Sequence, residues 1–515
     1  MVIARWFILS LLTIGVLSIS WTGSPYQFVK INSDTQQNLD EMRILSIIHD
    51  PILIGSDADF AAQAGIEGWS GDGSESTPYV IQQLDISDDE DCIHIENTTS
   101  YFIISGCELT SPLYRNGYGI FLKNATNGVI SNCVVHLKSI GIYIDYNSDY
   151  TGISFNAIYD NYDAIKIFHA KYCQVIWNAI TLNGKGIDIY SDDCFIGYNS
   201  IAHCSGAYGY GIDAYASDRL QVIHNTFYNN SLYDFNADIS AYMTVAHNVF
   251  DDGIWFSDVR DLSDVIITFE NNTLDGREIG YFLNRNNQQI NINQYSEVIV
   301  VNCTNLVLHS GDIYGAYFGY SYKCVLERSY VHGSPYIGVA IEESQKCNVT
   351  SNVIYENHLI GIHLEYSHNC TISLNSVFHN NPEEKSDCGG ISIDHYSTYN
   401  IVFANAIGWN FGNAVDRGRG GDIRNNNTWD DGVSIGNWWD DYSGHGQYLI
   451  PGNEGSVDRY PSKLNDIVQT IFTEPLTPGD GNGGDSPDFV LLVTVVGAGL
   501  VVIIVVILLV TRKRV

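Results

Sequence analysis

A short pattern that returns about every 21 to 26 residues constrains the fold of this chain more than any other feature. The stretch "GIDIYSDDCFIGYNSIAHC" begins at Gly186, and "GIDAYASDRLQVIHNTFYNN" begins at Gly211. In both copies, small or aliphatic residues alternate with polar ones after the glycine, and an asparagine follows thirteen or fourteen residues later. A period in this range is typical of a solenoid, in which each repeat buries its apolar face against its neighbours.

The recurring asparagine marks the repeats along most of the chain. It stands at Asn132, Asn156, Asn178, Asn199, Asn225, Asn248, Asn271, Asn352, Asn375 and Asn405, with Gly106, Gly311 and Ser329 at the same position elsewhere. Asparagine tolerates the left-handed conformation that a sharp bend needs, and its amide can bond to copies above and below. We therefore expect these residues to form a structural ladder rather than to take part in catalysis.

Each repeat contains three short apolar segments. In the copy at Gly186, Ile187 and Ile189 follow the glycine in period two, Ile196 precedes the asparagine, and Ile201 follows it. Such segments indicate three strands per turn, each with one face toward a core. The sequence therefore predicts an all-β fold, a single-stranded parallel β-helix of about thirteen coils.

These repeats resemble those of right-handed parallel β-helix proteins, a class that holds pectin lyases, polygalacturonases and NosD-type proteins. The stretches "PILIGSDADFAAQAGIEGWSGDGSESTPYVIQQLDI" from Pro51, "IGNWWDDYSG" from Ile435 and "DRYP" from Asp458 are similar to the ends of NosD-type and archaeal surface β-helix proteins. The resemblance covers about residues 50 to 462. It implies a right-handed β-helix that binds or processes carbohydrate, and it does not imply one particular reaction.

The two ends predict an exported protein with a membrane anchor. Residues 1–21 hold one arginine and an apolar run, which is typical of a signal peptide, although an uncleaved anchor is the alternative. Residues 489–510 are uncharged and almost entirely apolar, and a basic tail follows at 511–515, which predicts a transmembrane helix with the preceding chain outside the cell. Between these ends we expect an N-terminal region and cap (22–84), coils (85–425), a NosD-like end motif (426–462) and a flexible stalk (463–488).

The charge of the chain excludes one class of partner. Against 25 Lys and Arg it carries 59 Asp and Glu, a net charge of -34, spread along the sequence. Such a surface repels phosphate backbones, so we expect no nucleic-acid partner, and cations or neutral sugars suit it better. Eleven cysteines would allow disulfides in an exported protein, but several share a repeat position with Leu220, Met243 and Ile266, which favours buried free thiols.

The strand after each glycine predicts a ligand-binding face. Because Ile187 and Ile189 point inward, Asp188 and Tyr190 point outward, and the same parity holds in neighbouring coils. Aromatic rings that alternate with carboxylates on a flat surface can stack on sugars and accept their hydroxyls. The predicted carbohydrate-binding residues are Tyr143, Asp188, Tyr190, Asp213, Tyr215 and Trp255. The alternative is that exposed strands simply favour aromatic residues.

Asp188 and Asp213 occupy one column on successive coils, at a separation that would suit a retaining glycosidase. They are therefore the weak candidates for a catalytic pair, although any repeated outward aspartate would give the same arrangement. No catalytic residue is assigned on this basis.

Two further columns suggest metal ligands. Glu342, Glu365 and Asp394 form an acidic column with oxygen ligands of the kind that Ca²⁺ prefers, or else a solvated acidic stripe. His224, His247 and Glu270 each precede a ladder position and could hold a transition metal if they faced one way. The chain contains only three methionines, so a NosD-like role in copper binding lacks its usual soft ligands.

Three hypotheses for function follow. The first is a cell-surface, membrane-anchored β-helix that binds polysaccharide or glycoconjugate. The second is a polysaccharide lyase or glycosidase that uses Asp188 and Asp213. The third is a structural envelope or adhesion protein, with the copper-binding accessory role as a further alternative. The oligomeric state and the role of the irregular segment 277–296 do not follow from the sequence.

Overall fold

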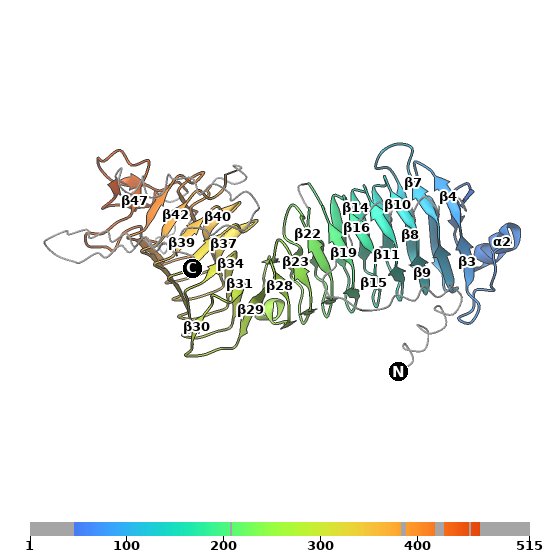
Figure 1. Cartoon of the computed structure of the whole chain (residues 1–515), viewed down its shortest axis with the longest axis horizontal. Coiled ribbons are helices and arrows are strands. Elements are labelled where there is room, and N and C mark those ends of the chain that lie inside the picture. Colours follow the sequence, from blue (N-terminus) through green and yellow to red (C-terminus); the bar gives the residue numbers. More distant parts are fainter. Residues whose placement is uncertain (1–45, 207–208, 383–387, 418–426, 453–454, 464–515) are drawn as a thin grey trace, which may run out of the picture. The chain divides into compact units, whose positions relative to one another are not determined.

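The computed structural model describes residues 46–463, apart from 207–208, 383–387, 418–426 and 453–454. Over this range the chain forms a parallel β-solenoid (Figure 1), which confirms the predicted fold. Within it, no helix has the length and apolarity needed to cross a membrane. The predicted signal peptide (1–21) and transmembrane helix (489–510) lie outside the described residues, so both stay predictions.

The N-terminal coils, which we call the first block, are built from three parallel sheets. The sheet after the recurring glycine contains β2 (Ile52–Ile54), β5 (Ile93–Thr98), β8 (Tyr118–Ala125), β11 (Ile140–Asp145), β14 (Asp163–Phe168), β17 (Lys185–Tyr190), β20 (Ile212–Tyr215), β23 (Phe235–Asp238) and β26 (Ile254–Ser257). The second contains β3 (Tyr79–Gln82), β6 (Phe102–Ser105), β9 (Gly128–Ser131), β12 (Gly152–Ser154), β15 (Gln174–Ile176), β18 (Phe195–Gly197), β21 (Gln221–Ile223), β24 (Thr244–Ala246) and β27 (Thr268–Glu270).

The third sheet of the first block completes each coil after the asparagine corner. It contains β1 (Ile47–Ile48), β4 (Leu84–Ser87), β7 (Glu108–Thr110), β10 (Val134–His136), β13 (Ala157–Tyr159), β16 (Ala179–Thr181), β19 (Ser200–Ala202), β22 (Thr226–Tyr228), β25 (Val249–Phe250) and β28 (Thr273–Leu274). Helix α2 (Asp57–Glu67) lies at the N-terminal end beside β3 (Figure 1). It buries Phe60, whose ring stacks on Tyr79 with centroids 4.6 Å apart, so α2 covers the open end of the core.

A β-hairpin divides the solenoid. Strand β28 turns through Asp275 and Gly276 and pairs antiparallel with β29 (Arg277–Leu283), whereas the coil strands on either side pair in parallel. Both turn residues have positive φ, 50° and 74°, which suits a two-residue hairpin of the Asp-Gly type. The coils after this hairpin form the second block. The irregular segment 277–296 is thus the hairpin strand and most of the first coil of that block.

The second block repeats the three-sheet pattern. Its first sheet continues the third sheet of the first block through the β28–β29 pair, and it contains β29, β31 (Tyr295–Val301), β34 (Gly315–Gly319), β37 (Ile337–Glu342), β40 (Ile360–Glu365), β43 (Ile391–Ile393) and β46 (Ala414–Asp416). Its second contains β30 (Gln289–Asn291), β32 (Val307–His309), β35 (Val325–Glu327), β38 (Asn348–Thr350), β41 (Thr371–Ser373) and β44 (Ile401–Phe403). Its third contains β33 (Asp312–Ile313), β36 (Tyr330–His332), β39 (Val353–Tyr355), β42 (Ser376–Phe378), β45 (Ala406–Gly408), β47 (Trp438–Trp439) and β50 (Ser462–Lys463).

The coil count corrects the sequence expectation. The described residues form about sixteen coils rather than thirteen. The count missed the first coil around β2 and the coil within 277–296, because their corner residue is not asparagine. It also left out the coil with Asn437 at its corner, which was assigned to the end motif.

The asparagine ladder is present, but three of the expected positions, at Gly106, Asn132 and Asn271, are one residue out of place. Each ladder asparagine donates its side-chain N–H to the side-chain oxygen of the next, at 2.9–3.2 Å, along Asn156, Asn178, Asn199, Asn225, Asn248 and Asn272. Asn271 is exposed, and the ladder position belongs to its neighbour Asn272. Likewise, Cys133 rather than Asn132 donates its backbone N–H to Asn156.

The glycine that opens each coil has a steric cause. At Gly186, a Cβ atom would lie 2.2 Å from the carbonyl oxygen of Gly211 in the next coil, and at Gly390 it would lie 2.0 Å from that of Asn413. No side chain fits at such distances, so these two positions require glycine, whereas Ala164 and Asp234 stand at the same register position in other coils. The cysteines fill core positions as predicted, because all eleven are buried and no disulfide forms among the described residues.

The two blocks have separate hydrophobic cores that share one wall. On β31, Val298 and Val300 face the core of the second block, whereas Ile299 and Val301 belong to the core of the first. Because both faces of β31 are buried, its sequence "YSEVIVV" lacks the alternation of the outer strands. The start of the second block therefore closes the C-terminal end of the first.

The C-terminal end of the second block is also closed. Asn437 accepts a hydrogen bond from the side chain of Asn405 and so extends the asparagine ladder of the second block. The Asp458 carboxylate accepts the backbone N–H of Asn437 at 2.7 Å and the ring N–H of Trp439 at 3.0 Å. Strands β48 (Tyr448–Leu449) and β49 (Val457–Asp458) form a small antiparallel pair there. The "IGNWWDDYSG" and "DRYP" stretches are thus the two parts of one cap.

Candidate functional site

The predicted outward columns form on the first sheet of the first block. Strand register pairs Lys166 with Asp188, Asp188 with Asp213, and Asp213 with Asn236. Tyr143 pairs with Lys166 on the preceding coil. Residues about two dozen apart in sequence are therefore neighbours across parallel strands, about 4.8 Å apart.

An aromatic column, defined as Phe168, Tyr190 and Tyr215, follows one edge of this face. The Phe168 and Tyr190 ring centroids lie 5.2 Å apart, and the Tyr190 and Tyr215 centroids also lie 5.2 Å apart. The Tyr215 side chain is 40% exposed, which leaves ring surface open to solvent. Tyr143 lies in a separate aromatic group, 5.1 Å from Phe121.

A charged row, defined as Lys166, Lys185, Asp188 and Asp213, runs beside the aromatic column. The Lys185 ammonium bridges the two aspartates, at 3.0 Å from Asp188 and 2.6 Å from Asp213. Lys166 also contacts Asp188, at 2.6 Å. At the end of the row, the Asn236 side-chain N–H donates to Asp213 at 2.9 Å.

The protonation states follow from these contacts. Burial alone would raise the pKa of Asp188, but Lys185 and Lys166 hold it below its usual value. Burial opposes the charge of Lys185, yet Asp188 and Asp213 keep its pKa above the usual value. Asp163, which pairs in register with Lys185, has a pKa raised to about 6 by burial and by Asp188. Lys185 and Asp188 therefore both carry their charges at neutral pH.

Lys185 is the residue of this site that the sequence did not predict. Strand parity places it on the same side as Ile187 and Ile189, and so in the interior. Lys185 pairs with Asp163, and Ile187 pairs with Ile165. The Lys185 side chain nevertheless reaches the outward carboxylates. A lysine just before the coil glycine, followed by aspartates on two successive coils, is the sequence signal that could have identified it.

Trp255 is placed differently from its prediction. Its ring stacks on Tyr233 with centroids 5.5 Å apart and contacts Tyr336 and Tyr317 of the second block, at 5.8 Å and 6.2 Å. The indole is thus partly covered at the junction of the blocks. Trp255 is therefore not an open platform like Tyr215.

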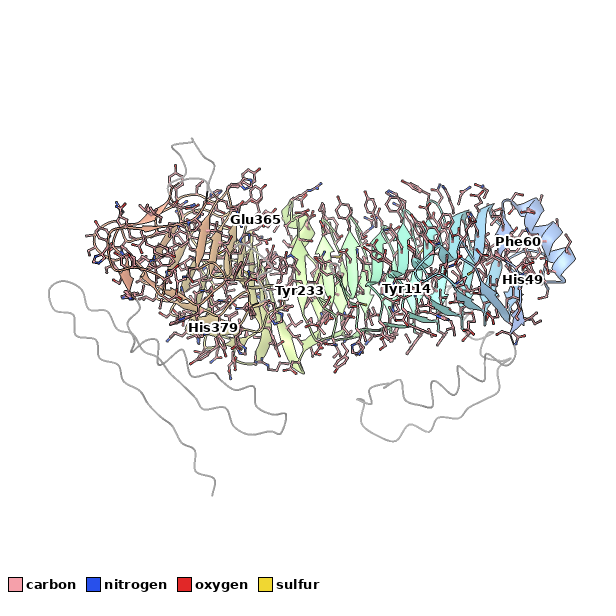
Figure 2. The ribbon with its side chains drawn as sticks, turned by 90° about the horizontal axis from the view of Figure 1, so that it is seen from above. His49, Phe60, Tyr114, Tyr233, Glu365 and His379 are labelled. Carbon is pink, nitrogen blue, oxygen red and sulfur yellow. The ribbon has the colours of Figure 1, made fainter. Side chains whose placement is uncertain are left out.

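The second acidic column forms in part. Glu342 pairs in register with Glu365, and the Tyr317 hydroxyl donates to Glu342 at 2.9 Å. Burial, with Glu365 nearby, raises the pKa of Glu342 to about 8, whereas His363 lowers that of Glu365. Asp394 follows Ile393, which pairs with Leu364, so its backbone continues the column beside Glu365, while its carboxylate accepts a hydrogen bond from the backbone N–H of Ser397 at 2.8 Å. Figure 2 labels Glu365 on the second block.

The predicted His–His–Glu column does not form. His224 and His247 stack with ring centroids 4.7 Å apart, but Glu270 pairs in register with Ala246 rather than His247. The cause is the one-residue offset of the ladder, which puts Asn271 in the column instead. Among the residues that the structure describes, no group of three or more His, Cys, Asp or Glu side chains could hold a metal ion.

Comparison with family models assigns the two blocks separately. Residues 91–250 match a family described as "Right handed beta helix region", and residues 286–444 match one described as "Periplasmic copper-binding protein (NosD)". The boundary between the matches coincides with the hairpin. Each match covers less than half of the chain. The first block is therefore similar to right-handed β-helix regions, and the second block is similar to NosD, in agreement with the parallel β-solenoid of the structure.

No curated protein sequence matches the chain. Among solved structures, it is similar to an alginate lyase from Paenibacillus sp., with 12% identity, a TM-score of 0.29, and coverage of 68% of this chain and 99% of that one. For an α-1,3-glucanase from Streptomyces thermodiastaticus the identity is 12%, the TM-score 0.28, and the coverage 69% and 68%. For a mannuronan C-5 epimerase module from Azotobacter vinelandii the identity is 10% and the TM-score 0.24, and the match covers 71% of this chain and 93% of that one. Likenesses at these levels assign no activity to this chain.

Proposed function

We propose that the chain binds a polysaccharide or glycoconjugate along the charged row and the aromatic column of the first block. The observation that carries this proposal is the alignment of the two features across successive coils. Aromatic rings at 5.2 Å spacing lie beside ionised groups that are held in place by ion pairs. This combination supplies apolar surface for sugar faces and hydrogen-bonding groups for hydroxyls.

The balance of charge favours an uncharged or weakly charged glycan. The two lysines of the charged row offset its two aspartates, although the chain as a whole is strongly acidic. A polyanionic ligand would meet the net negative charge of the remaining surface. Ligand binding outside the cell also agrees with the predicted signal peptide and anchor, which are part of the proposal.

The enzyme hypothesis gains less support. A retaining glycosidase needs one free carboxylate and one carboxyl group that stays protonated. Here both Asp188 and Asp213 are ion-paired with Lys185, and the pKa of Asp188 is lowered rather than raised. The pair therefore offers no group suited to act as a general acid, and we propose binding rather than turnover.

The test is a glycan array followed by titration calorimetry with the full-length chain. We expect Tyr190→Ala and Tyr215→Ala each to weaken binding about tenfold, because a lost ring contact of this kind is worth about 1 kcal/mol or more. The matched control is Tyr228→Ala, since Tyr228 is 52% exposed but lies on β22 in the third sheet. Equal losses in all three variants, or no glycan binding by the wild type, would contradict the proposal.

A further inference from the structure

A ridge of stacked aromatic rings runs along the corner between the second and third sheets of the first block. It consists of the residues that directly precede the ladder asparagines on five successive coils, namely Phe155, Trp177, Tyr198, His224 and His247. All five have a φ of 57–59° and an exposed side chain. We call this feature the corner ridge, and it lies apart from the charged row and the aromatic column.

The rings of the corner ridge cover one another's faces. The ring centroids of Trp177 and Tyr198 lie 4.6 Å apart, and those of Tyr198 and His224 lie 4.8 Å apart. His224 and His247 follow at 4.7 Å, and Phe155 is parallel to Trp177 within 2°, at 6.3 Å. Sugars stack on ring faces, so a ridge that presents mainly ring edges is poorly suited to glycan binding.

The corner ridge is nevertheless open to solvent. The exposed fractions are 54% for Phe155, 48% for Trp177 and 40% for Tyr198. Small residues border the ridge on the third sheet, two positions after each of its first four rings, namely Ala157, Ala179, Ser200 and Thr226. Large rings beside a strip of small residues form a surface that a second identical surface can complement.

The surface around the corner ridge lacks the charged residues that cover the rest of the first block. Asp, Glu, Lys and Arg are absent from the five segments that run from the second sheet across the ridge to the third, which are 152–159, 174–181, 195–202, 221–228 and 244–250. The corner between the first and second sheets, by contrast, carries ion pairs of Lys171 and Arg219 with Asp192. The absence of charge is therefore a property of one face and not of the coils as a whole.

These are the features of a protein–protein interface. The core of an interface is depleted of charged residues and enriched in Trp, Tyr and Phe. Two copies of a chain with a net charge of -34 repel each other wherever their charged faces meet. The face around the corner ridge is where two copies can approach without bringing like charges together or removing the hydration of an ion. This charge pattern favours a second copy of the chain as the partner.

We propose that two copies of this chain associate through the corner ridge, each placing its rings against the small residues of the other about a two-fold axis. A two-fold arrangement uses the same patch on both copies, so the assembly closes at a dimer. The charged row and the aromatic column lie on the first sheet and are not part of this interface. The inference therefore does not depend on the proposed glycan binding.

The test is sedimentation velocity of the full-length chain in a mild detergent, over a range of protein concentrations. We expect the wild type to form a dimer that dissociates on dilution. Trp177→Asp should raise the dissociation constant of this dimer by about tenfold or more, because it removes the largest ring and places a carboxylate from each copy in the interface. Aspartate tolerates the left-handed backbone of this corner. Tyr198→Asp should act in the same way, and it decides the question should Trp177→Asp fail to fold.

Tyr172→Asp is the matched control. Tyr172 lies on the same coil as Trp177, has a φ of 59° and is 46% exposed, and its ring stacks on that of Tyr150 with centroids 5.0 Å apart. It belongs to the corner between the first and second sheets, so this variant should keep the dimer. Equal weakening by Tyr172→Asp would overturn the proposal, as would a dimer that neither ridge variant weakens. A monomeric wild type would also overturn it, and loss of glycan binding by Trp177→Asp in that case would assign the ridge to a glycan instead.

Discussion

Lys185 stabilises the proposed binding face because it lies between two aspartates on successive coils. Without its ammonium group, Asp188 and Asp213 would be adjacent carboxylates with little solvent to separate them. The Lys185 side chain is 14% exposed, and those of the aspartates are 19% and 17% exposed. Removing one partner from a largely buried ion pair leaves the other charge uncompensated, which costs more than the pair itself contributes.

At the residue scale we therefore predict that Lys185→Met lowers the free energy of unfolding by about 3 kcal/mol at pH 7, measured by urea denaturation. Lys171→Met provides the comparison, because Lys171 pairs with Asp192 at 2.9 Å but is 48% exposed. We expect no measurable change for that variant, since exposed ion pairs contribute little. Similar effects of both substitutions would show that the bridge has no special role.

Strand parity predicted which side chains project onto the proposed binding face for most of its residues, but it failed for two residues. It placed Asp188, Tyr190, Asp213 and Tyr215 correctly, because alternation fixes the side of a strand from which a side chain projects. It misplaced Lys185, whose long side chain reaches the outer face from the start of a strand. It also could not show that tyrosines of the second block cover Trp255, which depends on contacts between distant segments.

At the element scale, the corner ladders explain why the repeat tolerates so much sequence variation between coils. Each ladder asparagine satisfies buried backbone groups as well as its neighbours. Asn272, for example, accepts the backbone N–H of Asn248 at 3.0 Å and donates to the carbonyl of Val245 at 2.8 Å. Serines form a similar ladder at another corner of the second block, from Ser321 through Ser344 to Ser367. The serine ladder was not predictable from the sequence, because serine is common on exposed surfaces.

The one-residue offset at Asn271 gives a sharp test. We predict that Asn272→Ala lowers the free energy of unfolding by roughly 2–3 kcal/mol, because it leaves buried backbone groups without partners. Asn271→Gly should change it by less than about 0.5 kcal/mol, since Asn271 is exposed and glycine adopts its φ of 53° without strain. Chemical denaturation of both variants distinguishes the two positions, and the reverse order of effects would place the ladder at Asn271.

At the scale of the whole molecule, several buried carboxyl groups make stability depend on pH. Burial raises the pKa of Asp234 to about 7 and that of Glu342 to about 8. A carboxyl group with a raised pKa binds more protons in the folded than in the unfolded state, so its contribution to stability falls as pH rises from about 4.5 to about 8. At pH values above the pKa that the group has in the folded state, its contribution to stability is fully lost.

We therefore predict that the Tm of the chain falls between pH 5 and pH 8. Glu342→Gln should show a shallower fall, because its amide keeps a hydrogen bond with the Tyr317 hydroxyl and does not titrate. Glu356→Gln, at an exposed position, should follow the wild type. A Tm that rises over this range, or an equal slope for Glu342→Gln, would contradict the assignment of these protonation states.

The periodic sequence alone was enough to predict a β-helix with stacked columns, because side-chain alternation and corner residues are local properties that each coil repeats. Division into two blocks was not visible in this periodicity. It depends on a two-residue turn at Asp275 and Gly276 and on β31, whose two faces pack against different cores. Only the tertiary structure could show that the rings of the corner ridge stack face to face, since ring orientation depends on packing between coils rather than on the repeat.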